Sequence, residues 1–161
     1  METAETPRPE TAKERLVRTF WERHSNPKSG WTRALSYPAV MVALYRHDWK
    51  LLGATVLFVA VNPVLFPKPD PERAGDSWMY RGVLGERLWM ERGDKRGYPN
   101  VLNALNVPIF LCGLYAAYRR KPRATALCTL LSAGLKFWFV GEMVRYYEAH
   151  REEFDSPSAS D

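Results

Sequence analysis

The sequence predicts an all-α protein, a multi-pass membrane helical bundle with about four transmembrane helices arranged as two hairpins. An N-terminal amphipathic helix and a partly helical central loop complete the prediction. The main observation is that charge is unevenly spread, although a quarter of all residues are charged. Residues 51–66 and 101–118 contain no charged residue, whereas residues 1–33 and 68–96 are rich in them. Uncharged stretches between basic flanks are typical of membrane-spanning segments.

The N-terminal half predicts a surface helix followed by the first hairpin. Residues 11–24 carry apolar side chains at helical spacing among charges, which is typical of a helix lying on a membrane; a soluble helix packed on its own domain is the alternative. Asn26 is suited to cap the next helix, with a proline at its first position. Residues 34–45 are uncharged but only 12 in number. Because a full crossing needs about 20 residues, this segment crosses the bilayer only with its flanks, or crosses half of it.

The C-terminal half predicts a loop and the second hairpin. Residues 76–92 can form a helix, but their apolar positions are scattered around it and define no single membrane face. Residues 101–118 are the clearest span, and residues 126–144 return across the membrane with Lys136 in the middle. The predicted organisation is therefore a disordered tail over residues 1–10, one membrane domain over 11–147 and a flexible acidic tail over 148–161.

The distribution of lysine and arginine predicts the orientation. Sixteen of these residues fall in the N-terminal part, the central loop and the C-terminal part, and six fall in the two hairpin turns. Because positive residues favour the cytoplasm, we expect a cell-membrane protein with both termini and the central loop inside.

Polar residues of the predicted hairpins should meet at the inner side. In an antiparallel hairpin, residues at equal depth have numbers with a constant sum, which sets Asn62 level with Arg33 and Asn106 level with Lys136. Glu142 and Arg145 are three residues apart on one helix and should form an ion pair. Two groups of candidate residues follow. The ligand or headgroup candidates are His24, Asn26, Arg33, Asn62, Glu86 and Arg87. The intramembrane polar residues are Asn103, Asn106, Lys136, Glu142 and Arg145.

Lys136 stands out because a lysine at mid-bilayer costs about 3 kcal/mol and needs a partner or water. It either binds an anion or moves protons, or it is a structural lysine bonded to Asn106 or to a carbonyl.

Several classes of protein are excluded or disfavoured. Cys112 and Cys128 both lie in apolar runs, which favours buried free thiols over a disulfide and excludes a zinc cluster. The three histidines are scattered, so we expect no metal site, and we expect no cofactor. Motifs for phosphate loops, hydrolases and nucleic-acid modules are absent, so the basic charge is better explained by phospholipid headgroups than by nucleic acid. The charged start predicts no cleavable secretion signal.

Four strings together resemble a known family. They are Phe20-Trp-Glu-Arg-His-Ser-Asn-Pro27, Trp31-Thr-Arg33, Val61-Asn-Pro-Val-Leu-Phe-Pro67 and Leu84-Gly-Glu-Arg-Leu-Trp89. They are similar to a prokaryotic family of small integral membrane proteins classed as a domain of unknown function, over roughly residues 19 to 147. The resemblance implies a four-helix membrane protein and supplies no catalytic residue, substrate or cofactor.

Three functions compete. The first is a non-enzymatic membrane module that binds lipid headgroups or a protein partner at its cytoplasmic face, with Arg23, Arg33, Arg81 and Arg87 contacting phosphates. The second is a homo-oligomeric transporter or channel component that uses Lys136, Asn106 and Asn62. The third is an interfacial enzyme acting on a lipid-phosphate substrate, with His24 or Glu86 as general base and Arg33 and Arg87 on the phosphate. The sequence favours them in this order and identifies no catalytic residue.

Overall fold

The computed structural model describes residues 11–93 and 97–154, and these residues are all-α, without strands. The predicted disordered segment 1–10 and the end of the predicted acidic tail lie outside the described residues. The helices, in chain order, are α1 (Ala12–His24), α2 (Pro27–Arg46), α3 (Trp49–Leu65), α4 (Pro71–Ala74), α5 (Trp78–Glu91), α6 (Tyr98–Tyr118), α7 (Pro122–Ala149) and α8 (Arg151–Phe154).

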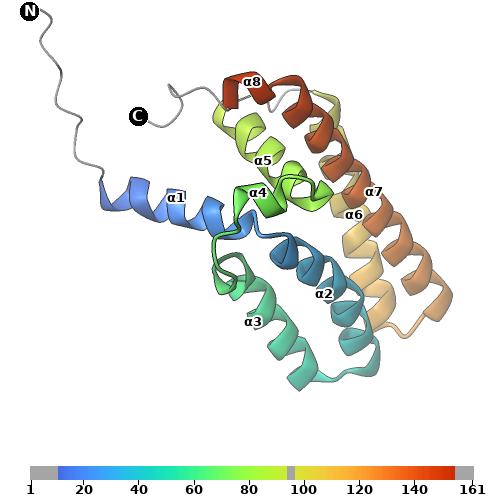
Figure 1. The fold of residues 1–161 in the computed structure, drawn as a ribbon. Helices are drawn as coiled ribbons and strands as arrows, with labels where there is room; N and C mark the ends of the chain where they lie inside the picture. The colour runs from blue at the N-terminus through green and yellow to red at the C-terminus, as the bar shows by residue number, and fades with distance from the viewer. Residues whose placement is uncertain (1–10, 94–96, 155–161) are drawn as a thin grey trace, which may run out of the picture.

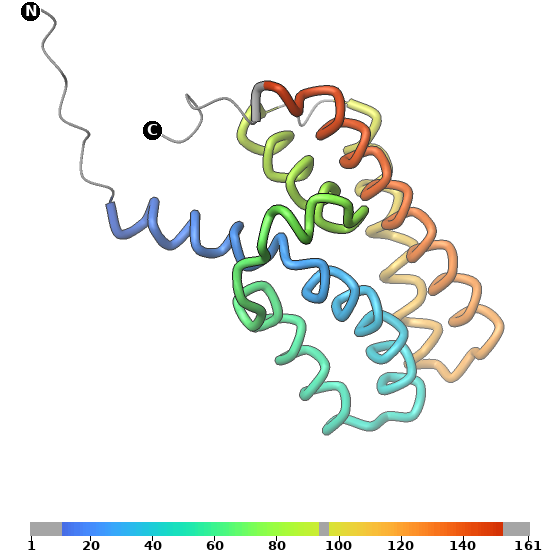
Figure 2. Tube along the Cα trace, in the orientation of Figure 1, coloured from blue at the N-terminus to red at the C-terminus, as the bar shows by residue number. Residues whose placement is uncertain are grey.

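Two long antiparallel hairpins, α2–α3 and α6–α7, make up most of the molecule (Figure 1). Both of their turns lie at the same end, where Arg120 Nε donates to His47 Nδ1 over 3.1 Å. Within residues 11–93 and 97–154, His47 and Arg120 are also the two non-glycine residues with positive φ, 56° and 52°, because each lies in the tight turn of a hairpin. The tube in Figure 2 shows the hairpins running in nearly the same direction away from these turns. We call this the turn end.

The opposite end, which we call the polar end, carries α1, α4 and α5 and the C-terminal part of α7 (Figure 1). Polar side chains cap the N-termini of α1 and α2 at this end. Thr11 and Glu14 form a reciprocal capping box at α1, and Asn26 Oδ1 accepts from the backbone N–H of Lys28 over 2.9 Å at the start of α2. The predicted cap at Asn26 is thus confirmed. α1 points away from the hairpins and touches them through α3 and α2.

α5 packs closely against α7 in the polar end. A Cβ at Gly85 would lie 1.9 Å from the carbonyl oxygen of Met143, so only glycine permits this separation of the two helices. Trp89 of α5, Leu102 of α6 and Phe139 and Met143 of α7 form the core beside it. The apolar residues of α5 are scattered around the helix because its buried positions, among them Met79, Leu84 and Leu88, lie on more than one side.

Two helices of the described chain, α6 and α7, are long and apolar enough to cross a membrane. α3 is apolar but has only 17 residues, and α2 has 20 residues without sufficient apolar composition. By helix length and apolar composition, two of the four predicted spans can therefore cross a membrane, and a bundle of four spans is not confirmed. α2 is nevertheless one continuous helix through Pro38, longer than the uncharged run 34–45.

Candidate functional site

Polar side chains from α1 and α2 close the end of α3 at the polar end. α3 stops at Leu65, before Pro67, so its last carbonyls have no helical donor. Arg23 Nη1 donates to the carbonyl of Val64 over 2.8 Å, and Asn26 Nδ2 donates to the carbonyl of Pro67 over 2.9 Å. A guanidinium at a helix C-terminus is also favoured by the helix dipole. These contacts fix the junction between α1 and α2 against α3.

Asn62 forms the buried polar contact inside the α2–α3 hairpin. Its side chain is fully buried, its Oδ1 accepts from Ser29 Oγ over 2.7 Å, and its Nδ2 donates to Thr32 Oγ1 over 2.9 Å. The depth rule sets Asn62 level with Arg33, and the structure pairs it with Thr32, one residue from that position along α2, and with Ser29, one helical turn from it. Ser29, which is also fully buried, was not among the predicted candidates. A small polar residue facing an expected intramembrane asparagine is the signal that would have found it.

Arg33 and His24 meet beside this contact. Arg33 Nη1 lies 3.1 Å from His24 Nδ1 and 3.0 Å from His24 Nε2. The lone pair or N–H bond of each ring nitrogen lies in the plane of the ring, and those of the two nitrogens point in diverging directions. Arg33 Nη1 is almost equidistant from both nitrogens, so it lies over the face of the ring. Phe20 stacks on the same imidazole, with ring centroids 5.1 Å apart. Arg33 Nε is buried and has no hydrogen-bond partner within the described part of the chain.

Charged groups from two further helices surround this pair. Burial, followed by the positive charges of Arg33 and Lys136, lowers the pKa of His24 to about 4, so His24 is neutral at pH 7. Glu86 of α5 interacts electrostatically with Arg33. His24 and Arg33 are therefore in contact, and the charges of Glu86 on α5 and Lys136 on α7 lie near enough to act on this pair. We call these four residues the junction cluster.

Other predicted residues have different partners. Arg145 Nη1 lies 2.8 Å from Glu142 Oε1, the ion pair that the spacing predicts. Arg87 Nε lies 2.7 Å from Glu91 Oε1, and Arg81 Nη1 lies 2.8 Å from Glu148 Oε1. These two arginines of the predicted phosphate-binding group are thus already paired with carboxylates.

Asn106, which the depth rule sets level with Lys136, is hydrogen-bonded to a different residue of α7. Asn106 Oδ1 accepts from Ser132 Oγ, one helical turn before Lys136 on α7. Lys136 is exposed, and its Nζ lies 4.7 Å from the ring centroid of Phe139. Asn103 is half-buried on α6. The transporter hypothesis places Lys136 and Asn106 along one path, but the two residues have different neighbours.

The surface has two hollows, and Arg87 is the one predicted ligand candidate that lines either of them. A groove of about 400 Å³ between α2 and α3 is lined by Thr32, Leu35, Ser36, Ala39, Ala54, Thr55 and Phe58. A hollow of about 340 Å³ lies between α1 and Arg87. The enzyme hypothesis requires a cavity lined by both His24 and Glu86, and neither of these two hollows is lined by both residues. Cys112 and Cys128 are free thiols, and within residues 11–93 and 97–154 no three metal-binding side chains are grouped.

Comparison with known proteins gives one match. Residues 13–156, which are most of the chain, match a family of unknown function, DUF6653. Searches among curated proteins and among solved structures find no match.

Proposed function

We propose a membrane role for this chain, which belongs to the DUF6653 family of unknown function. In this proposal both hairpins lie in the bilayer, and the polar end lies at the cytoplasmic surface. The protein is a non-enzymatic module that binds the headgroups of anionic lipids there. A binding role is favoured over catalysis because basic residues such as Arg23 and Lys28 are exposed at this end, whereas neither of the two hollows is lined by both His24 and Glu86.

The observation that carries the proposal is the exposure of the apolar helices. Only 22% of the most apolar stretch of α6 and 11% of that of α7 is buried. A core helix of a soluble protein would be mostly covered. Large exposed apolar side chains follow one another along α6, including Val101, Leu105, Val107 and Leu111. Soluble monomers rarely expose contiguous apolar surface of this extent.

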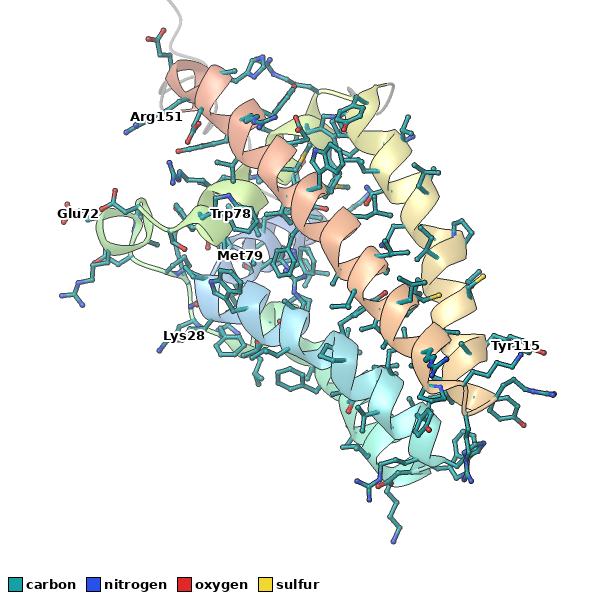
Figure 3. All side chains as sticks on the ribbon, turned by 90° about the vertical axis from the view of Figure 1, so that its right-hand side faces the viewer. Lys28, Glu72, Trp78, Met79, Tyr115 and Arg151 are labelled. Atoms are coloured by element: carbon teal, nitrogen blue, oxygen red, sulfur yellow. The ribbon has the colours of Figure 1, made fainter. Side chains whose placement is uncertain are left out.

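Aromatic residues at both ends of α6 support a membrane of ordinary thickness. Tyr98 and Tyr118, at its two ends, are 50% and 51% exposed. They are separated by about 30 Å at about 1.5 Å per residue, which equals the thickness of the hydrocarbon core. Tyrosine and tryptophan are enriched at membrane–water interfaces. In Figure 3 Tyr115 marks the turn end, far from Arg151 at the polar end.

A cluster of aromatic residues on α2, α5 and α7 marks the membrane–water border at the polar end. The rings of Trp31, Trp78 and Phe137 lie 6.0–6.3 Å apart, centroid to centroid. Figure 3 shows Trp78 and Met79 beside the start of α2, near Lys28. If this cluster lies at the interface, α2 and α3 extend from it through the bilayer beside α6, where Met41 contacts Gly113.

The basic residues at this border suit anionic headgroups. Arg23 and Lys28 are exposed on either side of the α1–α2 junction. Each basic residue near an anionic membrane surface contributes about 1 kcal/mol to the attraction. α1 carries further basic residues and the exposed apolar side chains Leu16 and Val17, as expected for a helix at the membrane surface.

The test is native mass spectrometry of the full chain released from nanodiscs of phosphatidylcholine and phosphatidylglycerol. We expect phosphatidylglycerol to be retained above its share of the disc. The variant Lys28→Gln should reduce this enrichment about fivefold, since one charge contributes about 1 kcal/mol. The matched control, Arg87→Gln with Glu91→Gln, removes a whole ion pair and should leave the enrichment unchanged. Retention equal to the bulk share, or release of the protein from membranes by alkaline carbonate, would contradict the proposal.

A further inference from the structure

The junction cluster combines groups from four helices that are otherwise far apart in the sequence. His24 ends α1, Arg33 lies on α2, Glu86 on α5 and Lys136 on α7. Salt bridges elsewhere in the described chain mostly join residues three or four apart on one helix, such as Arg87 and Glu91. The charges of the junction cluster are instead brought near one another by tertiary packing.

Only part of the Arg33 guanidinium contacts another described group of the protein. Its Nη1 lies over the imidazole of His24, and its Nε is buried without a described partner. A buried guanidinium donor without a partner costs free energy and therefore calls for an explanation. Nε and a neighbouring Nη form the fork with which arginine binds a phosphate through two parallel hydrogen bonds. The position of Nε thus indicates an anion as its partner.

His24 complements this fork. Its two described hydrogen-bond contacts are both to Arg33 Nη1, which lies over the ring and not in its plane. A neutral imidazole carries one N–H donor in its plane, and a protonated one carries two. A bound phosphate oxygen in that plane would accept from His24 and would favour its protonation.

The charges of the cluster match a singly charged ligand. Arg33 and Lys136 are two cations and Glu86 is one anion, so the cluster carries a net charge of about +1 with His24 neutral. A phosphodiester carries one negative charge at pH 7. Lys136 precedes Phe137 of the aromatic cluster with Trp31 and Trp78, so the site lies at the depth of lipid headgroups if the proposed function holds.

From these observations we infer that His24, Arg33 and Lys136 form one binding site for the phosphodiester group of an anionic phospholipid, with Glu86 holding Arg33 in place. The inference rests on the proposed function and specifies where the headgroup binds. Burial, and after it the charges of Arg33 and Lys136, keep the His24 ring neutral. Binding favours uptake of a proton at His24, because the added anion offsets the two positive charges.

The test follows the pKa of His24 by NMR of the histidine-labelled full chain in nanodiscs. The other two histidines, His47 and His150, are assigned with glutamine variants. In discs of phosphatidylcholine alone, whose choline cation Arg33 and Lys136 repel, we expect His24 to titrate near 4, and with phosphatidylglycerol we expect its pKa to rise above this value. Lys136→Gln should abolish the lipid-dependent rise. Lys136 is exposed, so this variant should fold.

Two further variants separate the fork from charge alone. Arg33→Lys keeps the charge but loses Nε, and we expect it to lose most of the rise. Arg145→Gln, on the same helix as Lys136 but paired with Glu142, should keep it. An equal rise caused by inorganic phosphate in phosphatidylcholine discs would overturn the assignment to a lipid. An unchanged His24 titration while phosphatidylglycerol is still retained would overturn this site but not the proposed function, whereas loss of retention in the native chain would overturn both.

Discussion

Arg23 and Asn26 show how single polar residues fix the polar end. Each donates to a carbonyl just at or beyond the end of α3, where helical donors are missing because the helix stops before Pro67. The strings Phe20–Pro27 and Val61–Pro67, which carry the family resemblance, are the two segments joined by these contacts. A physical reason for their occurrence together is therefore that one caps the other.

Residue pairs within a hairpin were predictable to about one helical turn. The depth rule sets Asn62 level with Arg33, and the structure pairs it with Ser29 and Thr32. For Asn106 the same rule gives Lys136, and the structure gives Ser132. The rule ignores helix rotation, so it fixes depth but not the face of the partner. The approach of Glu86 and Lys136 to the His24–Arg33 pair depends on packing between hairpins, which no local pattern specifies.

His24 predicts an acid-dependent loss of stability in discs without anionic lipid. Burial, then the charges of Arg33 and Lys136, lower its pKa from 6.5 to about 4. Between these values the unfolded chain binds a proton at His24 and the folded chain does not, so stability falls as the pH falls. We expect this group to remove at most about 3 kcal/mol of unfolding free energy from pH 7 to pH 4.

Thermal unfolding followed by tryptophan fluorescence over this pH range checks the prediction. His24→Gln should be less sensitive to acid than the native chain, because glutamine does not titrate. His150→Gln should keep the native sensitivity, since His150 contacts Tyr146 at the end of α7 instead. Equal slopes for His24→Gln and the native chain would show that His24 titrates alike in both states.

At the scale of elements, the sequence located the long helices better than their ends. The runs 101–118 and 126–144 correspond to α6 and α7, but α7 extends from Pro122 to Ala149. Uncharged length predicts the part that fits hydrocarbon, whereas a helix continues into water as far as its hydrogen bonds and packing allow. α5 was predicted as a helix without a single apolar face, and its contact with α7 through Gly82 and Gly85 explains that pattern.

The packing of α5 on α7 predicts a strong effect of one methyl group. Gly85→Ala would place Cβ 1.9 Å from the Met143 carbonyl oxygen and 2.7 Å from its carbon, both backbone atoms. The helices would have to separate, so we expect a loss of about 2–3 kcal/mol or more in unfolding free energy. Gly134→Ala is the matched control on α7, with no atom within 4 Å of the added methyl. It should be neutral or slightly stabilising, because alanine favours helices by up to about 1 kcal/mol. Equal melting temperatures for the two variants would contradict this account of the α5–α7 contact.

For the molecule as a whole, the two hairpins divide the chain into two ends of different character. The turn end holds His47 and Arg120 in contact, and the polar end holds α1, α5 and the junction cluster. The sequence predicted this grouping from the order of apolar runs, since four successive crossings of one bilayer place both hairpin turns on the same side. Which end faces the cytoplasm was predicted from the count of lysine and arginine, and it stays a prediction.

The native thiol Cys112 offers a direct test of what surrounds the apolar helices. It is exposed on α6, within the stretch that the proposal places in hydrocarbon, and it is not in a disulfide. In water an exposed thiol would react readily with a polar maleimide. In intact membranes we therefore expect Cys112 to resist a membrane-impermeant maleimide from either side and to react after solubilisation and unfolding, as read by a mass shift of the protein.

Introduced cysteines extend the same experiment to orientation, in a background where Cys112 and Cys128 are replaced by serine. Lys50→Cys, directly after the first hairpin turn, should be labelled from outside intact cells. Ser77→Cys, directly before α5, should be labelled only after the membrane is opened, because the positive-inside rule places the polar end in the cytoplasm. The reverse pattern would invert the orientation and leave the membrane location intact. Rapid labelling of Cys112 in sealed membranes would instead show that water, or a partner that admits water, covers α6, and the bilayer location would then be wrong.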